Sequence, residues 1–109
     1  MIATQDIAKE IYESTKRLEK GAKEIFQLAK EQAETEREYR KALAHEKIKL
    51  KDKGMAMGMI DDVARGNLSD LLFERDLAEA RYVAGRDSIK AISTQVNALQ
   101  SILKIQSDI

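Results

Sequence analysis

The feature that most restricts the fold of this sequence is a regular run of apolar positions in its second half. Steps of four and three residues alternate without a break through Ala78, Tyr82, Gly85, Ile89, Ile92, Val96, Leu99 and Leu103. This spacing is the heptad pattern of a coiled-coil seam, the stripe of a long helix that packs against a neighbouring helix. It predicts a helix over about residues 68–107, with Asn67 or Ser69 as its N-cap.

A second long helix is expected over about residues 4–52, because the chain contains no proline to interrupt it. Its apolar residues fall on two lanes of seven-residue spacing. One lane contains Ala8, Thr15, Ala22, Ala29, Leu43 and Leu50, and the other contains Ile11, Leu18, Ile25 and Tyr39. We therefore expect these two lanes to form the contact stripe of the first helix.

The segment between the two helices, "KDKGMAMGMIDDVARGN", contains three glycines and predicts a linker with one short helix over about residues 53–67. Two long helices joined by such a segment predict an all-α antiparallel helical hairpin, with residues 1–109 as a single domain. We interpret the linker methionines as adaptable packing at the end of the hairpin. The alternative is a methionine-rich surface that binds a protein partner through Met55, Met57 and Met59.

The second helix carries more apolar residues than one antiparallel partner covers. The residues outside its seam include Phe73, Leu77, Val83 and Ile102. An apolar stripe this wide is rarely left exposed on a monomer. The pattern therefore predicts a homodimer or higher oligomer, in which these four residues dock two hairpins into a four-helix bundle.

Charge is balanced overall, with 19 basic and 19 acidic side chains, but it is uneven along the chain. Residues 40–53 hold a basic stretch that consists of Arg40, Lys41, Lys47, Lys49, Lys51 and Lys53. A hairpin would place this stretch beside the acidic residues of 66–79, so we interpret it as internally paired. The alternative is that the same side chains contact the phosphates of a nucleic acid.

No residues are predicted to be catalytic, to bind a cofactor or to bind a metal. His45 is the only histidine, the chain has no cysteine, and Ala42 stands where a di-iron helix bundle has a glutamate. No apolar run approaches the roughly 18 residues that a membrane span requires. These observations favour a cytoplasmic, non-enzymatic protein that binds itself and an unidentified protein partner.

Four segments, "YRKALAHEKIKLKDKG", "DDVARGN", "FERDLAEARYVAG" and "ALQSILK", resemble small uncharacterised helical proteins of temperate phages of Gram-positive bacteria, over residues 39–105. The resemblance implies a phage-type interaction or assembly protein in the cytoplasm of the bacterial host. It transfers no catalytic residue. Its alternative implication is an accessory role in phage replication or recombination, with the basic stretch 40–53 on nucleic acid.

Overall fold

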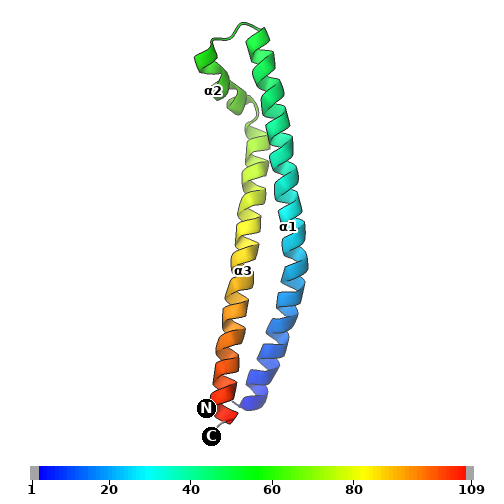
Figure 1. Cartoon of the computed structure of the whole chain (residues 1–109), viewed down its shortest axis with the longest axis vertical. Helices are drawn as coiled ribbons and strands as arrows, with labels where there is room; N and C mark the ends of the chain where they lie inside the picture. The colour runs from blue at the N-terminus through cyan, green and yellow to red at the C-terminus, as the bar shows by residue number, and fades with distance from the viewer. Residues whose placement is uncertain (1–2, 108–109) are drawn as a thin grey trace. The chain divides into compact units, whose positions relative to one another are not determined.

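The computed structural model describes residues 3–107, which form three helices and no strand: α1 Thr4–Asp52, α2 Met57–Asn67 and α3 Ser69–Ser107 (Figure 1). The predicted all-α class is therefore confirmed. The chain divides into two compact units. We call residues up to Gln27 together with residues from Val83 onward the terminal unit, and Leu28–Tyr82 the central unit. Assignment of residues 1–109 to a single domain stays a prediction.

In the terminal unit, the first part of α1 packs antiparallel to the last part of α3. The hydroxyl of Thr4 donates a hydrogen bond to Oε1 of Gln106 at 3.2 Å. Gly21 lies against Ile89, whose Cγ1 would be 3.1 Å from a Cβ atom built on the glycine. Because Thr4 precedes Gly21 while Gln106 follows Ile89, these two contacts define the antiparallel direction.

The heptad positions of α3 are buried or half-buried throughout, as the sequence predicts. In the terminal unit the predicted α1 lane of Ile11, Leu18 and Ile25 is half-buried, as expected, but the other lane is wrong by one residue, because Ala8, Thr15 and Ala22 are exposed. The lane that faces α3 lies one position earlier and consists of Ile7, Ser14 and Gly21. Hydropathy alone favours alanine over serine and glycine, whereas the close approach of Ile89 to Gly21 favours a residue without a side chain at that position.

Ser14 is completely buried, yet its hydroxyl has partners on its own helix. It accepts a hydrogen bond from a guanidinium nitrogen of Arg17 at 2.9 Å and donates to Oε1 of Glu10 at 3.4 Å. Burial of a hydroxyl costs little when both its donor and its acceptor functions are satisfied. This local network therefore allows a polar residue in the apolar contact.

In the central unit, α1 ends in a Schellman motif. The N–H of Met55 donates to the carbonyl of Leu50 at 3.1 Å, and the N–H of Gly54 donates to the carbonyl of Lys51 at 2.9 Å. Gly54 has a φ of 86°, the left-handed conformation that this motif requires at the residue after the helix. The side chain of Met55 turns back onto Leu50, which completes the apolar contact typical of the motif.

Helix α2 packs beside the last turns of α1 (Figure 1). Ile60 and Ala64 of α2 are buried with Leu50 of α1, and Leu43 and Val63 pack against them. This contact explains why Leu43 and Leu50 are covered although Ala8 and Ala22, on the same seven-residue lane, are exposed. Only the central unit has a third helix on that side of α1.

The junction of α2 and α3 is the single residue Leu68. Its N–H donates to the carbonyl of Ala64 at 3.1 Å, and its carbonyl accepts from the N–H of Leu72 at 3.0 Å. Leu68 therefore ends one helix and begins the next, and the prediction that Asn67 or Ser69 caps α3 is wrong. The amide of Asn67 instead donates to Oε1 of Glu46 at 3.0 Å and ties the end of α2 to α1.

Candidate interaction surfaces

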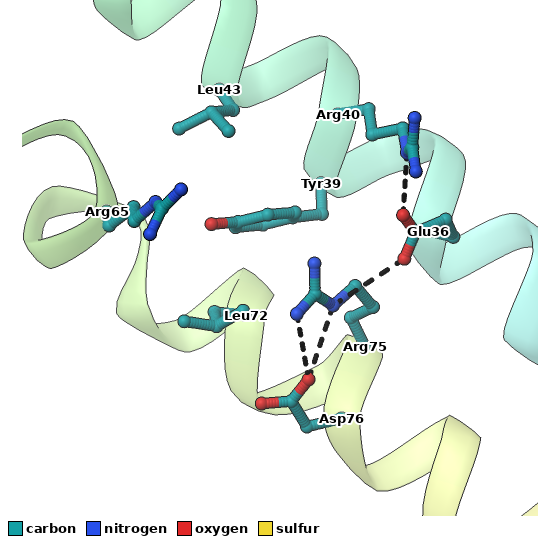
Figure 2. A pocket seen from close by; sticks show the side chains of 8 residues that line it. All are labelled: Glu36, Tyr39, Arg40, Leu43, Arg65, Leu72, Arg75 and Asp76. Carbon is teal, nitrogen blue, oxygen red and sulfur yellow. Dashed lines mark hydrogen bonds and ion pairs between the residues drawn. The ribbon is translucent and has the colours of Figure 1, made fainter. Parts of the chain in front are cut away.

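A pocket of the central unit surrounds Tyr39 and has a volume of about 440 Å³. It is lined by Glu36, Tyr39, Arg40, Leu43, Arg65, Leu72, Arg75 and Asp76 (Figure 2). Tyr39 is buried because the α1 stripe turns it toward α3, between Leu43 and Leu72. Its hydroxyl points toward Arg65 of α2, so side chains from all three helices meet around one ring.

Arg75 is the charged centre of this pocket. Its guanidinium carbon lies 4.7 Å from the centroid of the Tyr39 ring, within the range of a cation–π contact. Its nitrogens lie 3.5 Å from Glu36 and 3.1 Å from Asp76. Burial by itself would lower the pKa of Arg75, but the hydrogen bond to Asp76 and the charges of Asp76 and Glu36 raise it above its ordinary value. Arg75 is therefore held as a cation between an aromatic ring and two carboxylates.

This arrangement suits a structural contact better than a ligand site. Three guanidinium groups line the pocket, but Arg40 and Arg75 both contact Glu36, and Arg75 also contacts Asp76. An anion that bound Arg40 or Arg75 would have to displace these carboxylates, which already form charge-assisted hydrogen bonds with the two guanidinium groups. The sequence pattern gives no sign of the pocket because Glu36 and Arg75 lie 39 positions apart and both stand among many similar charges.

The basic stretch 40–53 is less neutralised than the sequence analysis expects. Lys47 pairs with Asp61 of α2 at 2.9 Å, and Arg40 pairs with Glu36 of its own helix. The other members, Lys41, Lys49, Lys51 and Lys53, are exposed and form no ion pair with any carboxylate of residues 3–107. The expected pairing fails because α2, and not the acidic start of α3, lies beside this part of α1.

Asp61 shows the effect of the one cross-helix pair in this stretch. Its hydrogen bond to Lys47, together with the charge of Lys47, lowers the pKa of its carboxyl group below the ordinary value. The pair is exposed to solvent, so it orients α2 on α1 more than it stabilises the fold.

The linker methionines divide into two kinds. Met55 is half-buried and packs against the Leu50, Ile60 and Ala64 cluster, as the packing interpretation expects. Met57 and Met59 are exposed by 76% and 57%, and the packing interpretation is wrong for them. Whether they contact a partner stays a prediction.

Met57 borders a groove between α1 and α2, of about 280 Å³, that we call the α1–α2 groove. It is lined by Lys47, Ile48, Lys51, Met57, Ile60 and Asp61. Ile48, which is 60% exposed, is not among the residues that the sequence predicts for a binding surface. Its signal was a bulky β-branched residue on a face of the first helix that otherwise carries charge. The groove therefore combines apolar side chains with two lysines.

The four predicted interface residues lie in different units. Phe73 and Leu77 belong to the central unit, where Phe73 is 62% exposed and Leu77 is half-buried. Val83 and Ile102 belong to the terminal unit and are exposed to a smaller extent. Phe26 on α1 is the most exposed aromatic residue of the terminal unit, at 75%, and lies outside the predicted interface.

No group of three or more His, Asp or Glu side chains within residues 3–107 gathers closely enough to hold a metal ion. His45 is exposed on α1. None of the helices in the described part of the chain contains an apolar segment of the length needed to span a membrane. No protein-family model, curated protein sequence or solved structure matches the chain.

Proposed function

We propose that this chain is a non-enzymatic interaction and assembly protein that works by self-association of an antiparallel helical hairpin. The observation that supports this proposal is the exposure of Phe73, which is 62%, on a helix whose seam is already occupied by α1. Full burial of a phenylalanine side chain contributes about 1.5–3 kcal/mol, so an aromatic residue left in water at this position provides a driving force for association.

Two hairpins that dock through this surface would form a four-helix bundle, and a two-fold dimer is the commonest arrangement. Leu77 follows Phe73 by one helical turn and extends the same apolar surface. Val83 and Ile102 would add contacts along α3. The exposed lane of Ala8 and Ala22 on α1 offers a second surface on which helices approach closely.

Sedimentation equilibrium or light scattering at micromolar concentration tests the proposal. The wild type should be a dimer or larger, and Phe73→Asp should shift it toward monomer with unchanged helicity by circular dichroism. Phe26→Asp is a matched control, because Phe26 is at least as exposed but lies outside the predicted interface. A wild type that is monomeric over this range would overturn the proposal.

The four unpaired lysines favour a second candidate, an accessory nucleic-acid-binding protein. Replacement of Lys41, Lys49, Lys51 and Lys53 by glutamine should then weaken binding to single- and double-stranded DNA and flatten its salt dependence. Absence of binding at low salt would exclude this candidate. Phage origin and a location in the host cytoplasm are part of both candidates, and they rest on the resemblance to phage proteins alone.

A further inference from the structure

We infer that the α1–α2 groove receives Phe73 from a second copy of this chain. This inference rests on the proposed self-association and names the surface that accepts the exposed ring. The groove, Phe73 and the charges around both lie in the central unit.

The groove has the composition of a site for an apolar side chain with acidic neighbours. Ile48 is 60% exposed and Met57 is 76% exposed on its walls, and Ile60 of the buried cluster also contributes. Methionine adapts its shape to an incoming group because it is unbranched and flexible. Lys51 at the edge forms no ion pair within residues 3–107, whereas Lys47 is paired with Asp61.

The first turns of α3 present the complementary chemistry. Asp70, Phe73, Glu74 and Leu77 follow the spacing i, i+3, i+4 and i+7, which places them on one face of the helix. Helices that bind in apolar grooves use this spacing for their anchoring residues. Asp70 and Glu74 are exposed and form no ion pair with any side chain of residues 3–107. This face of α3 thus presents the exposed ring of Phe73 between two carboxylates that form no ion pair within residues 3–107.

The size and charge of the two surfaces match. A groove of about 280 Å³ is slightly smaller than a small-molecule pocket, which suits one aromatic side chain and part of its helix. Lys51 of the groove would then lie near Asp70 and Glu74 of the second copy, and none of the three forms an ion pair within residues 3–107 of its own chain. Opposite charges of this kind set the orientation of a contact more than they add affinity.

The complementary face of α3 names a second copy as the occupant, because Phe73 does not fill the groove of its own chain and is free to enter that of another. A ring seated in the groove would be covered, whereas Phe73 is 62% exposed. Two copies can exchange the contact, each giving its ring to the other's groove, and such a reciprocal pair closes as a two-fold dimer.

Disulfide cross-linking tests the contact directly, because the chain contains no cysteine of its own. Single variants Met57→Cys and Phe73→Cys are mixed at micromolar concentration under a mild oxidant. We expect a disulfide to join the Met57→Cys and Phe73→Cys chains at least about tenfold faster than it joins the Met57→Cys and Phe26→Cys chains. A disulfide forms only when the two Cα atoms come within about 7 Å, so equal rates for the two mixtures would overturn the inference.

A charge exchange tests the predicted orientation in solution. Lys51→Glu and Glu74→Lys should each raise the dimer dissociation constant by up to about fivefold, which is the range of an exposed ion pair. The double variant should return to the wild-type value, because every lost pair is restored with its charges exchanged. Additive weakening in the double variant would contradict the placement of Glu74 at the lysine edge.

Substitutions in the groove separate this inference from the proposed function. Met57→Asp should raise the dissociation constant by about tenfold or more and leave helicity unchanged, since the Met57 side chain is 76% exposed. If Phe73→Asp abolishes association while Met57→Asp and Ile48→Asp do not, the groove is not the receiving surface and self-association still stands. A monomeric wild type would overturn both.

Discussion

Alanine substitutions at two glycines give a sharp test of how closely α1 and α3 pack. Replacement of glycine by alanine within a helix stabilises it by about 0.8–1.0 kcal/mol through helix propensity. At Gly66 in α2 no atom lies within 4 Å of the added Cβ, so Gly66→Ala should gain this amount. At Gly21 the Cβ would lie 3.1 Å from Cγ1 and 3.4 Å from Cδ1 of Ile89.

The cost at Gly21 follows from the stiffness of its neighbour. The χ1 angle of a β-branched isoleucine in a helix is restricted, so Cγ1 moves away only if the helices separate. Forcing an extra carbon into a well-packed contact costs about 1–3 kcal/mol. Gly21→Ala should therefore be less stable than Gly66→Ala by about 1–3 kcal/mol, and no more stable than the wild type.

Urea denaturation followed by circular dichroism measures this difference. The measurements need equal protein concentrations, repeated at several values, because self-association raises apparent stability. Gly54→Ala serves as a reference for backbone strain, because Gly54 has a positive φ and no atom within 4 Å of the added Cβ. Equal stabilisation by Gly21→Ala and Gly66→Ala would refute a close contact between α1 and Ile89.

Three further predictions concern the central unit. Lys47→Met should raise the pKa of Asp61 toward its ordinary value, as measured by NMR titration. In the wild type the folded-state pKa of Asp61 is lowered. The stability that the pair contributes is therefore present above about pH 4 and is lost as pH falls through the folded-state pKa. Arg75→Met should destabilise the protein by about 1–2 kcal/mol in urea denaturation, and by clearly more than Arg86→Met, because Arg86 contacts only its exposed neighbour in sequence. Leu50→Ala should cost about 2–5 kcal/mol, since it leaves a cavity in the cluster under α2, and a loss below 1 kcal/mol would contradict that packing.

The sequence predicts α3 well because its seam is apolar at every position except Gly85. From Ala78 to Leu103 every position of the heptad seam is buried or half-buried, so a heptad count finds the contact face. On α1 hydropathy and burial select different residues. Ser14 and Gly21 face α3 but are not hydrophobic, so the count selects Ala8 and Ala22, one position along, instead.

The candidate surfaces depend on α2, which is why the sequence predicts them less well. A hairpin of two helices would place the basic stretch beside acidic residues of α3, whereas α2 lies beside it. Composition gives no means to decide which of Met55, Met57 and Met59 is buried. That depends on the Schellman motif, which turns Met55 inward, and on the direction in which α2 then begins.

The lengths of the helices explain why α2 is present. Within the central unit α1 contributes residues 28–52 and α3 only residues 69–82, so α3 is too short to cover the last turns of α1. Helix α2, with 11 residues, covers them in its place. One face of α2 supplies Ile60 and Ala64 to the cluster around Leu50, while Met57 at its start borders the α1–α2 groove. A substitution at Ile60 would therefore damage the fold and the groove together, whereas Met57 can be changed without loss of the buried cluster.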